Sequence, residues 1–177
     1  MNFKIIVKSI IALFIISLGK SSAQQESSNI EITLTGQITG SYNINHLEQA
    51  RIQNPNLPEN STIGIFTDPS SKDFPFDIAL ILGNLGKETL ETGNYAVVLV
   101  ENDIPQLKIG QKGGFMTIVP TKQSPPKIEY YTSSGNFIIT EIIESKSITG
   151  TFSLLLKSVD GDKIINAEGK FRVNINK

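Results

Sequence analysis

The sequence predicts an all-β fold, specifically an antiparallel β-sandwich of about ten short strands. Apolar and polar residues alternate in short runs along most of the chain, which is the pattern of half-buried strands. Clusters of Gly, Pro, Asn, Asp and Ser separate these runs at the spacing of turns. The chain has no cysteine, so a hydrophobic core has to stabilise the fold without disulfides. An up-and-down, lipocalin-like barrel has the same alternation and is the alternative.

Residues 1–23 have the three parts of a cleavable secretory signal. Lys4 and Lys8 give a basic start, residues 9–18 are mostly apolar, and Ser21 and Ala23 stand at positions −3 and −1 before a cut at Gln24. The apolar run is about half as long as the roughly 20 residues that a spanning helix needs. We therefore expect export to the periplasm or the medium, with no membrane span after cleavage. The absence of cysteine excludes a lipoprotein anchor.

Residues 24–177 have the length of a single domain, which buries enough surface to fold without metal or disulfides. No linker or internal repeat divides them, so we expect one all-β domain. Removal of Lys4, Lys8 and Lys20 leaves 13 basic and 17 acidic residues, a net charge of −4. A mildly acidic domain lacks the basic surface that nucleic-acid binding requires, so no nucleic-acid partner is expected.

The first third of the domain contains two predicted strands and one predicted helix. Residues 30–35 alternate strictly, with Ile30, Ile32 and Leu34 on one face, and the alternation resumes over residues 38–44. Residues 45–52 favour a two-turn helix with Asn45 as its N-cap. Residues 54–61 are predicted to form a long exposed loop, because they combine two prolines with three asparagines.

The middle of the domain contains five predicted strands: residues 62–67, 76–82, 95–100, 115–119 and 128–132. Residues 95–100 are continuously apolar, which indicates a central strand covered on both faces. Turns are predicted at residues 68–71, 83–84, 92–94, 113–114, 124–126 and 133–136.

The C-terminal part has the clearest pattern. Strands are predicted over residues 137–142, 148–156, 164–168 and 170–177, and the Asp160-Gly161 pair predicts a hairpin between the second and third of these. The alternation of the last strand predicts that Phe171, Val173 and Ile175 lie in the core.

Most catalytic chemistry is excluded by composition. No cysteine is present and His46 is the single histidine, so thiol nucleophiles and ordinary zinc sites lose their ligands. A serine triad would need His46 together with a Gly-x-Ser-x-Gly elbow, which the sequence lacks. Seventeen acidic residues leave a pair of catalytic carboxylates open in principle. The sequence therefore predicts a non-enzymatic protein with no cofactor.

Two short motifs are weak candidates for binding sites. Asp160 and Asp162 have the close spacing of calcium ligands but lack the rest of a calcium loop, and a hairpin corner explains them equally well. Tyr130 and Tyr131 are adjacent, so on a strand one side chain points inward and the other outward. An exposed tyrosine there could stack on a sugar or contact a protein partner.

The C-terminal half resembles small exported proteins and lipoproteins of Bacteroidota-type bacteria that are grouped as domains of unknown function. The resembling segments are Gly93-Asn94-Tyr95, Tyr131-Thr132-Ser133-Ser134-Gly135, Phe137-Ile138-Ile139-Thr140, Gly150-Thr151-Phe152-Ser153-Leu154 and Gly169-Lys170-Phe171-Arg172-Val173. The resemblance implies an exported β-rich domain and assigns no functional residue. This chain departs from the lipoprotein members because it has no cysteine for lipid attachment.

Three functional hypotheses follow from these patterns. The first is an exported, non-enzymatic β-domain that binds a partner protein or a surface polymer. The second is a barrel that encloses a small apolar ligand. The third is a glycan hydrolase with two carboxyl groups about 5–10 Å apart in a concave cleft.

Overall fold

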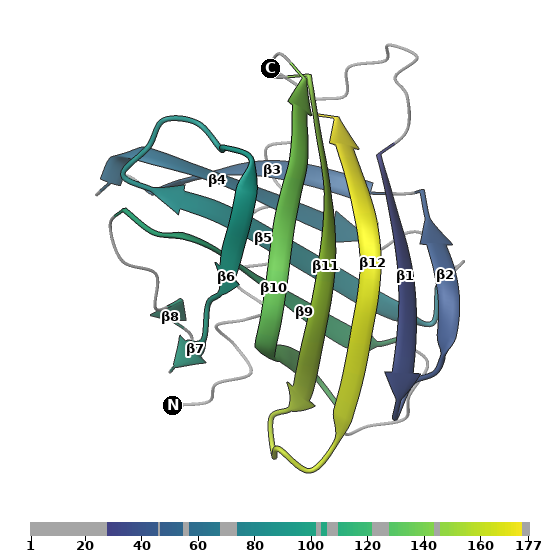
Figure 1. Cartoon of the computed structure of the whole chain (residues 1–177). Coiled ribbons are helices and arrows are strands. Elements are labelled where there is room, and N and C mark those ends of the chain that lie inside the picture. Colours follow the sequence, from purple (N-terminus) through teal and green to yellow (C-terminus); the bar gives the residue numbers. More distant parts are fainter. Residues whose placement is uncertain are drawn as a thin grey trace.

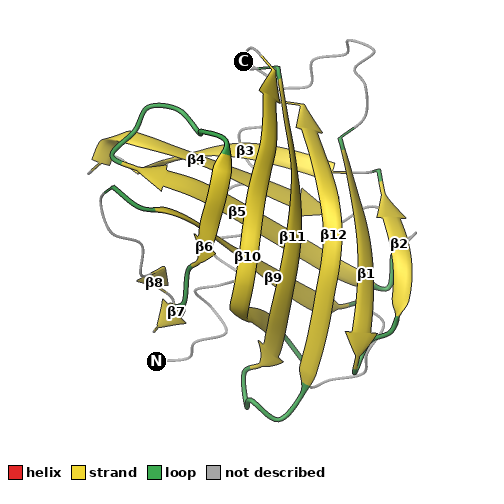
Figure 2. Ribbon diagram, in the orientation of Figure 1, coloured by secondary structure: helices red, strands yellow, loops and turns green. Residues whose placement is uncertain are grey.

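The computed structural model describes residues 28–45, 47–54, 57–67, 74–101, 104–105, 110–121, 128–143 and 146–174. These residues form strands joined by turns and loops, and Figure 2 shows no helix among them. The strands are β1 (Asn29–Gly36), β2 (Gly40–Ile44), β3 (Leu47–Asn54), β4 (Leu57–Thr67), β5 (Phe76–Leu85), β6 (Gly93–Val97), β7 (Val100–Glu101), β8 (Ile104–Pro105), β9 (Lys112–Pro120), β10 (Tyr130–Ile143), β11 (Ser147–Ser158) and β12 (Ile164–Asn174). The all-β prediction is confirmed. The described part of the chain contains no helix with the length and apolar character that a membrane crossing requires.

Ten of the strands form one sheet in the order β2-β1-β12-β11-β10-β6-β9-β5-β4-β3, which nearly closes into a barrel. The sheet folds over itself into two layers, as Figure 1 shows. The front layer contains β2, β1, β12, β11, β10 and β6, and strands β9, β5, β4 and β3 run crosswise behind it. The two edges, β2 and β3, are consecutive in the chain. The architecture thus combines the two layers of a sandwich with the nearly closed sheet of a barrel.

The sheet turns from one layer to the other where β9 and β10 separate. The first residues of β10 pair directly with β9, and β6 then lies between the two strands, antiparallel to β10 and parallel to β9. At the point of separation the Thr132 hydroxyl accepts a hydrogen bond from the Met116 N–H (2.7 Å) and donates one to the Met116 carbonyl (2.8 Å). A side chain therefore replaces the backbone of β10 as the partner of β9, and both buried backbone groups stay satisfied.

Apolar side chains from both layers form a single core cluster between them. Glycines and phenylalanines interlock on the inner face of the front layer, where Phe171 pairs with Gly150 and Phe152 pairs with Gly169. A Cβ atom added to Gly169 would lie 2.7 Å from the Phe152 ring, and one added to Gly150 would overlap the Phe171 ring. Each ring therefore occupies the space above a glycine, and this packing requires glycine at both positions.

The predicted helix over residues 45–52 is wrong, because residues 47–54 form β3 and pair with β4. A two-turn helix is marginal by itself, and pairing with a neighbouring strand outweighs its capping signal. The predicted loop over residues 54–61 is also wrong, since Asn54 pairs with Leu57 across a short connection. Pro58 is tolerated in β4 because the pairing of β4 with β5 begins only at Asn60.

Three predicted turns lie inside strands. Gly83 and Asn84 belong to β5, and Gly113 and Gly114 belong to β9, where Gly83 and Gly113 face each other. A Cβ atom on Gly114 would lie 2.8 Å from the Ile81 carbonyl oxygen, so this glycine permits a close approach of strands and makes no turn. Residues 133–136 form an irregularity within the continuous strand β10, with Gly135 at φ +119°.

The prediction of a central strand over residues 95–100 is wrong in extent and in burial. Strand β6 ends at Val97, Ala96 is exposed, and Leu99 is 50% exposed.

The predictions for the C-terminal part agree more closely with the structure. Phe171 and Val173 are buried, and Asp160-Gly161 lies at the β11–β12 hairpin, whereas Ile175 lies outside the described residues. Four other predicted features also lie outside the described residues: the turns at 68–71 and 124–126, His46, and the signal segment 1–23.

Candidate functional site

The outer face of the front layer carries an open hollow of about 780 Å³ over β2, β1, β12 and β11. Alternation along each strand determines which side chains reach it. On β1 the apolar residues Ile30, Ile32 and Leu34 point into the core, so Glu31 and Thr33 point outward. On β12 the same rule places Glu168 and Lys170 on the outer face.

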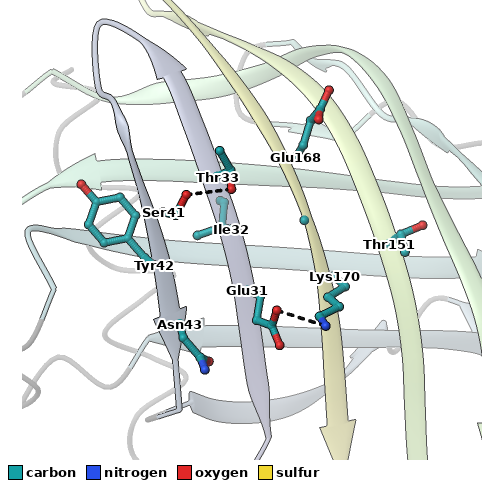
Figure 3. Close-up of a pocket in the computed structure, with 10 residues that line it drawn as sticks. Glu31, Ile32, Thr33, Ser41, Tyr42, Asn43, Thr151, Glu168 and Lys170 are labelled. Carbon is teal, nitrogen blue, oxygen red and sulfur yellow. Dashed lines mark hydrogen bonds and ion pairs between the residues drawn. The ribbon is translucent and has the colours of Figure 1, made fainter.

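Strand pairing arranges the outward side chains of this hollow in two parallel rows that cross the strands. The lysine row consists of Asn43, Glu31, Lys170 and Thr151, and the hydroxyl row of Ser41, Thr33 and Glu168. Between the rows lie Tyr42, Ile32 and Gly169, which pair with one another in register. Figure 3 shows both rows with their interactions. We call this structure the trench, with the two rows as its walls and the three paired residues as its floor.

Short polar contacts connect the side chains within each wall. In the lysine row, Lys170 Nζ lies 3.1 Å from Glu31 Oε2, and these side chains are 61% and 44% exposed. In the hydroxyl row, Thr33 Oγ1 and Ser41 Oγ are 3.0 Å apart and share a hydrogen bond. A surface ion pair of this kind contributes about 0–1 kcal/mol to stability. The walls of the trench therefore add little to the stability of the fold.

Glu168 carries the trench's uncompensated charge. Within the described part of the chain no basic group lies within ion-pair distance of its carboxylate. Glu168 pairs with Thr33, and Glu31 pairs with Lys170, so the two glutamates are diagonal neighbours on adjacent strands. The backbones of diagonal neighbours are roughly 7–8 Å apart, so the trench presents two carboxyl-bearing side chains on one face, as glycoside hydrolysis needs. In Figure 3 the Glu31 carboxylate is directed toward Lys170.

The two tyrosines singled out in the sequence lie on β10, and neither faces the trench. Tyr130 is 1% exposed, and burial, followed by the charge of Asp160, raises its pKa. Tyr131 is half-buried, and its hydroxyl donates a hydrogen bond to Glu129 Oε2 at 2.6 Å. The adjacent side chains thus differ in burial as alternation predicts. A binding role for either tyrosine stays a prediction.

The two aspartates singled out in the sequence lie at the β11–β12 hairpin, where Asp160 helps to form the turn. The Asp160 carboxylate accepts hydrogen bonds from the Ser158 hydroxyl and from the Asp162 N–H, and these bonds lower its pKa. Gly161 takes a positive φ of +80°, the conformation that this corner requires. Among the described residues no group of three or more His, Cys, Asp or Glu side chains could hold a metal ion.

A second polar cluster fixes the connection between β5 and β6. The buried Tyr95 hydroxyl donates to the Glu91 carbonyl (2.8 Å) and accepts from the Glu91 N–H (3.1 Å). Lys112 Nζ lies 2.8 Å from Glu91 Oε2, and this bond lowers the pKa of the Glu91 carboxyl. Burial raises the pKa of Tyr95. These groups are satisfied by one another, so the cluster holds a loop in place.

The back layer has a different outer face. Many of its outward positions carry half-buried apolar side chains, with Ile81 paired to Phe115 and Phe66 paired to Ala79. Polar residues stand among them, since the exposed Asp77 pairs with Val119 and Thr117 pairs with Ala79. An apolar outer face of this kind is typical of a surface that contacts another protein. It is the second surface of the described residues with a distinct chemical character.

The sequence interpretation missed every trench residue. Alternation alone identifies Glu31 and Thr33 as outward-facing, and the same holds for Glu168 and Lys170. The missing information is the pairing of β1 with β12, which joins the two ends of the described chain. No local pattern predicts this pairing, so the two sets of polar residues appear unrelated in the sequence.

The comparisons with known proteins do not assign a family. Protein-family models, curated proteins and solved structures were compared with the chain, and none matches. The function therefore has to be argued from the site alone.

Proposed function

We propose that this protein is an exported, non-enzymatic binding domain, and that its trench binds a surface polymer. The observation that carries the proposal is the concave arrangement of two polar rows on the outer face of β2, β1, β12 and β11. Such side chains offer donors and acceptors to a ligand without supporting the core. The export signal expected in residues 1–23 would deliver the domain to the compartment where surface polymers occur.

The polar groups at the ends of the outward side chains of the trench favour a polymer over a protein partner. Protein interfaces centre on buried aromatic and apolar anchors, whereas the outward side chains of the trench are hydroxyls, an amide, carboxylates and an amine. Tyr42, the aromatic residue of the floor, packs edge-on against Phe76 with ring centroids 4.8 Å apart. Its ring is therefore engaged within the fold.

The apolar-ligand alternative gains no support from the described interior. One contiguous cluster of apolar side chains lies between the two layers, and the Phe171 and Phe152 rings cover the inward-facing glycines. The enclosed-ligand function stays a prediction.

Glycan hydrolysis is the second candidate function, because Glu31 and Glu168 stand diagonally in the trench. Binding is favoured over hydrolysis for a physical reason. A catalytic acid is usually held in an apolar pocket that keeps it protonated, whereas Glu168 is exposed and Glu31 pairs with Lys170.

Affinity electrophoresis of the purified protein tests the proposal. Gels contain xylan, glucomannan, mixed-linkage β-glucan, polygalacturonate or chitosan, and the proteins are the wild type, the Thr33→Ala/Glu168→Ala variant and the Thr35→Ala/Asn166→Ala variant. Thr35 and Asn166 pair on the same outer face but lie outside the trench, so they provide a matched control. We expect at least one polymer to retard the wild type and the control, but not the trench variant.

Two results would contradict the proposal. Equal retardation of all three proteins would place binding elsewhere, and no retardation of the wild type by any polymer would remove polymer binding. Release of reducing ends from a bound polymer, abolished by Glu168→Gln with binding retained, would establish hydrolysis instead.

A further inference from the structure

We infer that the trench holds a single linear, uncharged polysaccharide chain that lies across the strands. This inference rests on the proposed function and adds the class and the direction of the ligand. Its basis is the register of four neighbouring strands, the chemistry of the two walls, and the charge of the trench.

The register determines the direction. Residues paired across neighbouring strands form a line perpendicular to those strands, and both walls of the trench are such lines. The lysine row extends from β2 to β11, which is three strand spacings or about 14 Å. A peptide that adds to a sheet runs alongside an edge strand. The trench instead runs across the strands, from the edge strand β2 to β11, so an occupant that fills it is an extended chain perpendicular to the strands.

The chemistry of the walls indicates which chemical groups line the two edges of the bound polymer. The hydroxyl row contributes two hydroxyls and a carboxylate, and the lysine row contributes an amide, a carboxylate, an ammonium and a hydroxyl. Each wall therefore both donates and accepts hydrogen bonds. A linear polysaccharide has hydroxyl groups along both edges, and each of these groups donates and accepts as well. The floor residues Ile32 and Gly169 send no outward side chain between the walls.

The charge of the trench indicates that the bound polysaccharide is neutral. Glu31 and Lys170 compensate each other at 3.1 Å, which leaves Glu168 as a single negative charge. A polyanion would meet this carboxylate on a protein that is itself acidic. A polycation carries many positive charges, and the trench offers it a single uncompensated carboxylate. Because an ionised carboxylate only accepts hydrogen bonds, Glu168 is suited to neighbouring hydroxyl groups of an uncharged sugar.

Calorimetric titration with a length series tests the inference. The probes are oligosaccharides of increasing length from whichever of xylan, glucomannan or mixed-linkage β-glucan is bound, with chitosan and polygalacturonate oligomers as charged counterparts. We expect affinity to rise with length until an oligomer spans the trench, and then to level off. Asn43→Ala in the lysine row and Glu168→Ala in the hydroxyl row should each weaken binding about two- to tenfold, the loss of one hydrogen bond.

Thr35→Ala and Asn166→Ala, which lie on the same strands as the hydroxyl row but outside the trench, should leave the affinity unchanged. Binding of charged oligomers alone, equal affinity for a monosaccharide and a long oligomer, or dependence on one wall only would overturn the inference while leaving polymer binding intact. Failure of the wild type to bind any polymer would overturn the proposed function, and the inference with it.

Discussion

The two layers of the sheet share one core but have opposite outer faces. The outer face of the front layer exposes two rows of polar side chains, including Thr33 and Glu168, to solvent. The outer face of the back layer carries half-buried apolar side chains such as Ile81 and Phe115. The inner faces of both layers are apolar and contribute to the same cluster. Most of the stability therefore comes from the inner faces, and the outer faces are available for function.

This difference indicates which interactions each face supports. A polar face adds little to folding and binds ligands through hydrogen bonds, since exposed ion pairs and hydroxyls are nearly neutral for stability. An apolar outer face keeps part of the hydrophobic contribution by packing its side chains across strands. Substitutions on the inner faces, on the apolar outer face and on the polar outer face should therefore lower the free energy of unfolding by different amounts, with the largest loss on the inner faces.

The largest effect is expected on the inner face of the front layer. Phe171→Ala removes a buried ring that covers Gly150 and should lower the free energy of unfolding by about 3–5 kcal/mol. Urea denaturation followed by circular dichroism measures it, with Phe171→Leu as the milder control. A cost below about 1 kcal/mol would contradict the interlocked packing, because burying an aromatic side chain is worth more than that.

The second-largest loss of stability is expected at Thr132, where the two layers join. Thr132→Val keeps the shape of the side chain but leaves the N–H and the carbonyl of Met116 without their partner. The expected cost is about 1–3 kcal/mol, because both groups are buried. Thr132→Ser keeps the hydroxyl and should recover most of the loss in the same denaturation experiment. Equal costs for the two variants would mean that packing, and not hydrogen bonding, determines the role of Thr132.

A smaller effect is expected on the outer face of the back layer. Phe115→Ala removes a cross-strand contact with Ile81 and should cost about 1 kcal/mol, the upper end for such pairs. The same side chain is removed in Phe115→Ala and in Phe171→Ala. The difference between their costs therefore measures how much more a phenylalanine stabilises the fold on the inner face than on the outer face. A cost equal to that of Phe171→Ala would show that Phe115 is as fully buried as the core.

The smallest effect is expected in the trench. Thr33→Ala and Glu168→Ala should change the free energy of unfolding by no more than about 0.5 kcal/mol, as is usual for surface positions. Thermal and urea denaturation of both variants measure this change. A loss above about 1.5 kcal/mol, beyond that surface range, would give these residues a structural role and weaken the case for a binding face.

The sequence was sufficient to predict the inner faces of the strands, because burial imposes a period of two on each strand. The alternation places Ile30, Ile32 and Leu34 on one face of their strand and predicts Phe171 and Val173 in the core, and all five are buried. The hairpin at Asp160-Gly161 was also predictable, since its conformation depends on adjacent residues. Local patterns thus gave correct results wherever the determining interactions were local.

The predictions failed where distant pairing controls the structure. Residues 45–52 have the capping signal of a helix, but β4 provides a ladder that makes them a strand. Gly113 and Gly114 have the composition of a turn, but they lie where the strands approach closely. The trench was not predictable for the same reason, because it depends on the pairing of β1 with β12.

Chemical-shift mapping by NMR tests the central claim most directly, because it compares both outer faces in one experiment. The amide spectrum of the protein is recorded during titration with a neutral polysaccharide that retards it in gels. We predict that the perturbed amides cluster on the trench floor and walls, around Ile32, Glu168 and Gly169, with the back layer unchanged. Perturbations centred on Ile81 and Phe115 would contradict the account and place the binding surface on the back layer.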